Sequence, residues 1–153
     1  MKPIFAAALA AALALPAQAS EDIADQYPQS ELYEKPVEVI PHVFSAIGAT
    51  APPTYENSGH NNNLSFVITG DGVVVINGAA SYRLAKALHD EIKALTDQPV
   101  KLVINENGQG HAMLGNSYWA EQGVDILAHV DAIHEIEEEG DFILQGMERY
   151  NRD

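Results

Sequence analysis

The feature that most constrains the fold is a pair of apolar runs, at residues 64–69 and 73–76, which flank Gly70-Asp71-Gly72. Two apolar runs separated by a short turn that contains glycine are typical of a β-hairpin. The second run is apolar at every position, which predicts a strand that is buried on both faces. We therefore expect a hairpin in this region whose second strand is covered from both sides.

The segments that follow alternate between helical and strand patterns. Leucine and isoleucine recur at helical spacing across residues 81–95, and an apolar run at residues 100–104 follows a Pro-containing break. The pattern further predicts a helix near residues 114–121, a strand at 125–128 and a strongly acidic helix over about 130–150. This order, with a hairpin followed by a βαβ unit, predicts an α/β fold.

The first 19 residues have the three parts of a secretory signal peptide. Lys2 supplies the positive charge, residues 4–15 form a short apolar stretch, and Ala17-Gln18-Ala19 forms a cleavage site before Ser20. The apolar stretch is too short to span a bilayer, although an uncut membrane anchor is the alternative interpretation. We expect cleavage after Ala19 and export to a bacterial periplasm.

The remainder of the chain is divided into a leader and one domain. Residues 20–36 are acidic and contain two prolines, which predicts a flexible leader. Residues 37–153 are expected to form a single domain that begins with an edge strand, which is bent at Pro41. A long loop rich in Pro, Asn and Gly is expected at residues 51–63, with His60 exposed to solvent.

The charge and the absence of cysteine exclude several functions. The net charge is −14, and such an acidic protein repels phosphate backbones and anionic lipid surfaces, so we expect neither nucleic-acid binding nor membrane binding. Without cysteine the chain has no disulfides, no thiolate zinc site and no thiol nucleophile.

Residues 105–116 follow the apolar run at 100–104 and read Asn-Glu-Asn-Gly-Gln-Gly-His-Ala-Met-Leu-Gly-Asn. This stretch resembles the metal-binding turn of metallo-β-lactamase-fold hydrolases, whose pattern is His-x-His-x-Asp-His. The runs at residues 61–69, 71–78 and 126–129 are similar to the strands that surround that turn. The resemblance covers about residues 37–149, which is nearly all of the expected mature chain.

The resemblance implies an α/β fold with the architecture of half of a metallo-β-lactamase-type αβ/βα sandwich. Such a half has one mixed sheet with helices on one face. The second half of the family fold is expected to begin where this chain stops. The other sheet face would then be open, so we expect self-association or a protein partner that covers it.

The resemblance also places the ligand slots of the family on residues of this chain that bind zinc poorly. The four slots hold Asn107, Gln109, His111 and Ala112, and Asn77 stands where the family has an aspartate. Carboxamides are weak zinc ligands, and an alanine side chain has no donor atom. His111 is therefore a weak metal candidate, and the alternative is that it hydrogen-bonds within the turn. No cofactor is expected, and no residue is assigned a catalytic role.

These observations lead to two hypotheses for function. The first is an exported, truncated member of this superfamily with a degenerate zinc site, which is catalytically inactive and either binds a partner or is vestigial. The alternative is a metal-dependent hydrolase of esters, amides or thioesters with residual or partner-completed activity. In that case zinc would be held by His111 with Asn107, Gln109 and a carboxylate such as Glu106.

Overall fold

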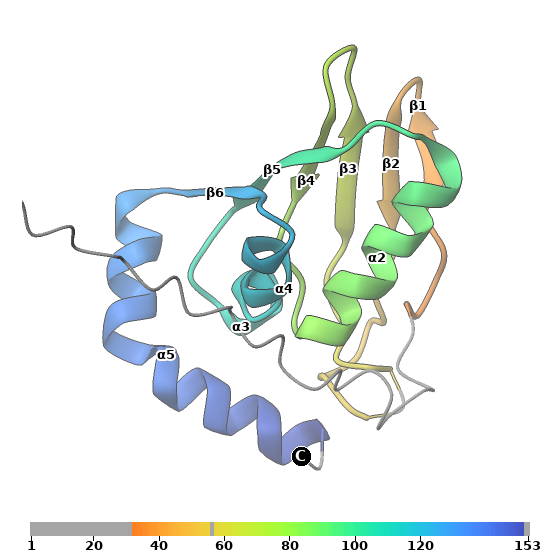
Figure 1. The fold of residues 1–153 in the computed structure, drawn as a ribbon. Helices are drawn as coiled ribbons and strands as arrows, with labels where there is room; N and C mark the ends of the chain where they lie inside the picture. Colours follow the sequence, from red (N-terminus) through yellow and green to blue (C-terminus); the bar gives the residue numbers. More distant parts are fainter. Residues whose placement is uncertain (1–31, 56, 152–153) are drawn as a thin grey trace, which may run out of the picture.

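The computed structural model describes residues 32–55 and 57–151, so the predicted signal peptide and most of the predicted leader lie outside the described residues. A six-stranded sheet in the order β1-β2-β3-β4-β5-β6 forms the centre of the molecule (Figure 1). The strands are β1 (Val37–Ile40), β2 (Val43–Ala46), β3 (Leu64–Ile68), β4 (Val73–Ile76), β5 (Val100–Asn105) and β6 (Asp125–Ala128).

The sheet is mixed, as the sequence predicts. Strands β1 to β4 pair in antiparallel fashion, whereas β4, β5 and β6 are parallel. The predicted hairpin is confirmed, with Ile68 opposite Val73 across the turn. The predicted βαβ unit is also confirmed, because helix α2 (Tyr82–Leu95) connects β4 to the parallel strand β5. The Ser81 hydroxyl caps this helix by accepting a hydrogen bond from the Leu84 amide at 3.2 Å.

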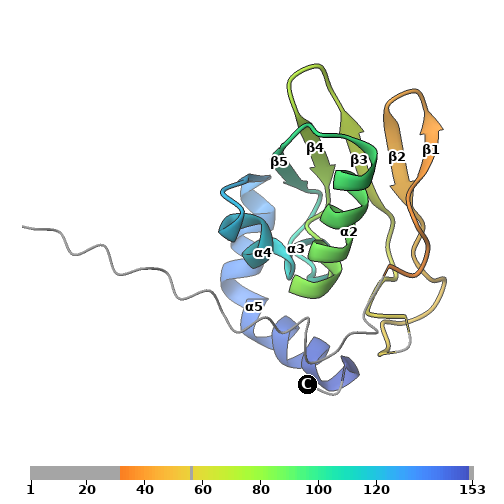
Figure 2. The ribbon, with the colours of Figure 1, turned by 45° about the vertical axis from the view of Figure 1, so that its right-hand side comes forward.

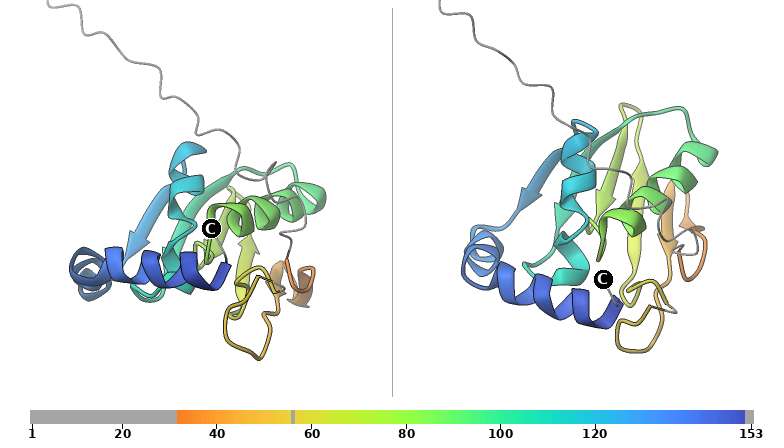
Figure 3. Two further views of the ribbon diagram at one scale, coloured as in Figure 1. Left: turned by 90° about the horizontal axis from the view of Figure 1, so that it is seen from below. Right: turned by 60° about the horizontal axis from the view of Figure 1, so that its bottom comes forward.

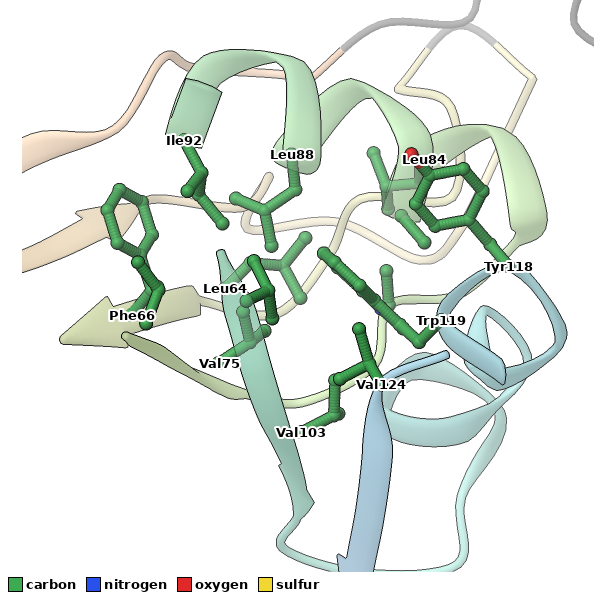
Figure 4. Close-up of a cluster of buried hydrophobic side chains, with 14 of the residues drawn as sticks. Leu64, Phe66, Val75, Leu84, Leu88, Ile92, Val103, Tyr118, Trp119 and Val124 are labelled. Carbon is green, nitrogen blue, oxygen red and sulfur yellow. The ribbon is translucent and has the colours of Figure 1, made fainter. Parts of the chain in front are cut away.

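Helix α2 and the short helix α4 (Asn116–Glu121) lie together on one face of the sheet (Figures 1 and 2). Trp119 of α4 is fully buried between α2 and the strands (Figure 4). The side chains that form this core at 0% exposure share one face of each element, and they include Leu64, Phe66, Val75, Leu84, Leu88, Ile92 and Val103. Helices on one face of one mixed sheet are the arrangement that the resemblance implies.

The opposite face of the sheet is only partly buried. In β4, Val73 and Val75 are completely buried on the helix side, while the alternate residues Val74 and Ile76 are half-buried. The prediction that this strand is buried on both faces is therefore wrong. A strand that is apolar at every position has two faces that are suited to burial. The sequence does not indicate whether another layer of this chain covers both of them.

Helix α5 (Val130–Asn151) has a different place from α2 and α4. It leaves β6 at the edge of the sheet and runs beneath the end of the strands, with its C-terminal end beside the loop at residues 51–63 (Figure 3). Its run of glutamates at residues 137–139 is exposed to solvent. Among the described residues, no helix is long and apolar enough to cross a membrane.

Three local expectations differ from the structure. Residues 37–46 form two paired strands and not one bent strand, because His42 adopts a left-handed φ of 68° and reverses the chain after Pro41. The helix expected near residues 114–121 is present as the shorter helix α4, and a separate short helix that was not expected, α3 (Gly110–Met113), precedes it. The last part of the expected leader contacts the domain, since Leu32 packs against the core and Lys35 pairs with Glu91 at 2.8 Å.

Candidate functional site at the carboxyl edge of the sheet

Two asparagines end the parallel strands β4 and β5 at the same edge of the sheet. The side-chain oxygen of Asn77 accepts a hydrogen bond from the Glu106 amide at 3.3 Å. In return, the side-chain oxygen of Asn105 accepts a hydrogen bond from the Gly78 amide at 3.2 Å. Both asparagines are at most 3% exposed. This reciprocal pair ties the turn after β4 to residues 105–116, which resemble a metal-binding turn in sequence and which we call the motif loop.

The turn at residues 77–80 is held in an unusual backbone conformation. Asn77 and Ala79 have φ angles of 71° and 81°, in the left-handed region that non-glycine residues rarely adopt. The Gly78 amide also donates to the Ala112 carbonyl at 2.6 Å, so the turn is bonded directly to the motif loop. Strained backbone of this kind persists only where its surroundings hold it in place, and functional sites are one such setting.

The four ligand slots have different environments. Asn107 is half-buried, and its side-chain oxygen accepts a hydrogen bond from the Gln109 amide at 2.9 Å, which makes a local turn. Gln109 is exposed, and Ala112 is completely buried at 0% exposure. The His111 side chain is 25% exposed, and its Nε2 atom lies 3.8 Å from a carboxylate oxygen of Glu106. The structure thus brings His111 together with Glu106, and Asn107 together with the backbone of Gln109.

This donor set does not fit zinc. A catalytic zinc site needs three protein ligands drawn from His, Cys, Asp or Glu. The loop offers His111 and Glu106, while Asn107 already accepts a backbone hydrogen bond and Ala112 has no donor. In the part of the chain that the structure describes, no group of three such residues is placed to hold a metal ion.

Helix α5 packs directly on the motif loop. The Gly108 amide donates to a carboxylate oxygen of Glu135 at 3.1 Å. A Cβ atom at Gly108 would lie 2.7 Å from the Ala132 carbonyl oxygen, and one at Gly110 would lie 2.9 Å from Cγ2 of Ile143. Gly108 and Gly110, which belong to the glycine spacing that resembles a metal loop, therefore allow α5 to pack closely against this loop.

A cleft of about 490 Å³ opens beside His111, between α3, α5 and the loop at residues 51–63. We call it the α5 cleft. Its lining includes Pro53, Asn61, Gly110, His111, Phe142 and Arg149. Its volume is within the range of small-molecule sites, and of the four slot residues His111 alone reaches it.

His60 is buried at 0% exposure, so the expectation that it is exposed to solvent is wrong. The Tyr33 amide donates to Nδ1 of His60 at 3.0 Å, and Ala49 donates to the His60 carbonyl oxygen at 2.8 Å. These bonds fold the long loop and the segment before β1 over the imidazole. Burial lowers the pKa of His60 below its ordinary value.

Sequence reasoning missed two contributors to this region. The first is Trp119, whose indole Nε1 donates to the Gly78 carbonyl at 3.0 Å and so fixes the turn from the helix side. A single tryptophan in the chain was an available signal. The second is α5, whose contact with the motif loop could not be read from its acidic surface pattern.

Comparison with known proteins supports the assignment of the fold. No protein-family model and no curated protein matches the chain. The metallo-β-lactamase FIM-1 from Pseudomonas aeruginosa in its mono-zinc form is similar over 72% of this chain and 48% of its own, with a TM-score of 0.60 and 17% identity. Metallo-β-lactamases from Hirschia baltica and Erythrobacter litoralis are similar over 69% of this chain, with TM-scores of 0.58 and 0.57 and identities of 19% and 16%.

These likenesses confirm the resemblance and the fold class. The chain is an α/β protein with one mixed sheet, consistent with half of a metallo-β-lactamase fold. It spans about half the length of the solved structures that it resembles.

Proposed function

We propose that this chain is an exported protein with a metallo-β-lactamase-like half fold that does not hydrolyse a substrate and acts by binding a protein partner. The absence of hydrolysis is proposed from the environment of the four residues that the resemblance places in ligand slots. Ala112 is completely buried in one slot, and the side-chain oxygen of Asn107 in another slot is already bonded to the Gln109 amide. A metal-activated water requires a bound metal, and these residues supply too few donors for one.

The open face of the sheet supports the second part of the proposal. The side chains of Ile76 and Ile104 lie opposite one another on this face, next to Leu127, which is 55% exposed. Exposed apolar surface that continues across several strands marks a protein interaction site. We propose that a partner, or a second copy of the chain, covers this face.

One observation favours the alternative of a metal-dependent hydrolase. His111 and Glu106 lie 3.8 Å apart, so a metal between them would have two protein ligands. A second polypeptide would have to complete such a site. The sequence of the chain leaves the class of substrate open between esters, amides and thioesters.

Metal content measured beside oligomeric mass tests the proposal. The purified mature chain should retain less than stoichiometric zinc after dialysis, and its zinc content should not change in His111→Ala. As a positive control, the variant Asn107→His/Gln109→His/His111→Asp should take up zinc, because two imidazoles and a carboxylate then share the loop. One tightly held zinc ion per wild-type chain, lost in His111→Ala, would establish the hydrolase alternative in place of the proposal.

A further inference from the structure

Apart from Arg149, the side chains that α5 contributes to the α5 cleft are apolar. Phe142 is 72% exposed, which is the largest value among the large hydrophobic side chains of the described residues. Ile143 and Met147 continue the same surface toward the motif loop. Apolar side chains gathered around a concave site are typical of ligand pockets, where they bind the apolar part of a ligand.

The other notable feature of the cleft is a cation, Arg149, for which the described residues supply no acidic partner. The described lysines all form ion pairs with carboxylates, namely Lys35 with Glu91, Lys86 and Lys93 with Asp90, and Lys101 with Asp71. In the part of the chain that the structure describes, no carboxylate lies within ion-pair distance of Arg149. Its Nε donates to the Gln145 carbonyl at 3.2 Å, which leaves the terminal nitrogens of the guanidinium for another acceptor.

Among the described residues, Arg149 therefore differs from the four lysines, each of which has a carboxylate partner. Arg149 lines the cleft together with His111, whose imidazole can add a second hydrogen bond. A carboxylate oxygen of Glu106 already lies 3.8 Å from Nε2 of His111, so the charge that would hold a carboxylate comes from Arg149. A guanidinium binds a carboxylate in bidentate fashion. The apolar side chains beside Arg149 favour an anion that also carries a hydrocarbon chain.

We propose that the α5 cleft binds a small amphipathic carboxylate. Its carboxylate group is held by Arg149 and His111, and its apolar chain lies along Phe142 and Met147. This site is separate from the open face of the sheet, so it stands whether or not a partner covers that face.

Three probes with the same eight-carbon chain test the chemistry of the site, namely octanoate, octan-1-ol and octylamine. Isothermal titration of the mature protein should give saturable binding of octanoate, with a Kd about tenfold lower than that of octan-1-ol, because a charge-assisted pair is worth about one order of magnitude in affinity. Octylamine should bind more weakly than octan-1-ol, since Arg149 repels it. In Arg149→Gln the preference for octanoate over octan-1-ol should disappear, whereas Lys101→Gln should retain it.

Gly146 offers a way to close the cleft without disturbing the fold. It lines the cleft from α5, and a Cβ atom placed on it meets nothing within 4 Å. Gly146→Leu should fill the apolar part of the site and lower octanoate affinity by more than about tenfold, while leucine is a better helix former than glycine. Gly140→Leu is the matched control on the same helix, because Gly140 does not line the cleft and its Cβ would make only an ordinary contact of 3.8 Å with Ile136.

Three results would overturn the proposal. The first is the absence of saturable octanoate binding at millimolar concentration. The second is equal affinity for octanoate and octan-1-ol in the wild-type chain. The third is concentration-dependent self-association that Gly146→Leu abolishes and Gly140→Leu does not, because the occupant of the cleft would then be a second copy of the chain.

Discussion

The indole nitrogen of Trp119 donates a hydrogen bond to the carbonyl oxygen of Gly78 at 3.0 Å, and both residues are buried. This bond links α4 to the strained turn after β4, and the asparagine pair links the same turn to the motif loop. The turn is therefore bonded to α4 through Trp119, to β5 through Asn105 and to α3 through Ala112. A buried turn with several hydrogen bonds should tolerate very little added volume.

Gly115 provides the sharpest test of this close packing. A Cβ atom at Gly115 would lie 2.1 Å from the Gly78 carbonyl oxygen and 2.9 Å from the Ser81 carbonyl oxygen. Because backbone atoms must move to accommodate it, Gly115→Ala should lower the free energy of unfolding by about 2–3 kcal/mol in urea titration. Gly70→Ala is the control, since its Cβ would meet nothing within 4 Å. Equal stability of the two variants would contradict the packing described here.

The sequence predicted the elements better than their contacts. The hairpin of β3 and β4, helix α2 and strand β5 follow from local periodicity, because each element carries its own apolar pattern. Helix α3 was missed, since a helix of four residues has little periodicity to read. The ligand slots were located by resemblance alone, and the packing of α5 on Gly108 and Gly110 depends on long-range contacts that no local pattern encodes.

The burial of His60 also depends on contacts that no local pattern encodes. It leads to a prediction about how stability changes with pH. A loop rich in Pro, Asn and Gly reads as solvent-exposed, yet its own backbone bonds fold it over the imidazole. Burial lowers the pKa of His60 in the folded state, while in the unfolded chain the imidazole titrates near 6.5. Below that value the unfolded chain binds more protons, so the stability of the protein should fall as the pH falls.

Urea titration between pH 7.5 and pH 5 measures this effect in a range where the carboxylates stay ionised. The free energy of unfolding of the wild-type chain should decrease by up to about 1.4 kcal/mol per pH unit below 6.5 for each such histidine. His60→Gln should reduce this slope. It should not remove it, because burial also lowers the pKa of His89. A slope that is identical in the variant would show that His60 is not the group that titrates.

Export can be tested at the amino terminus. We expect cleavage between Ala19 and Ser20, so that the mature protein begins with Ser-Glu-Asp-Ile. Ala19→Phe should block processing, because the position before the cleavage site accepts only small side chains. N-terminal sequencing of periplasmic material measures both outcomes, and Gln18→Phe is the control at a position with no such size limit. Periplasmic protein that still begins at Met1 would refute the assignment.

The open face of the sheet should drive association of the mature chain. Ile76, Ile104 and Leu127 lie in register across β4, β5 and β6 on this face, and the neighbouring hydroxyls of Ser45 and Ser65 bond to each other at 3.0 Å. Burying apolar surface is worth about 25 cal/mol per Å², so covering a few hundred Å² contributes on the order of 5–10 kcal/mol. We therefore expect light scattering coupled to size exclusion to give a mass above that of the monomer, or a stable complex with another protein.

Ile104→Lys should shift the chain to a monomer because it places a charge within the contact. Leu95→Lys should not, since Leu95 is an exposed apolar residue at the end of α2 and away from this face. A wild-type chain that is a compact monomer, melts cooperatively and binds no hydrophobic dye would show that this face needs no partner.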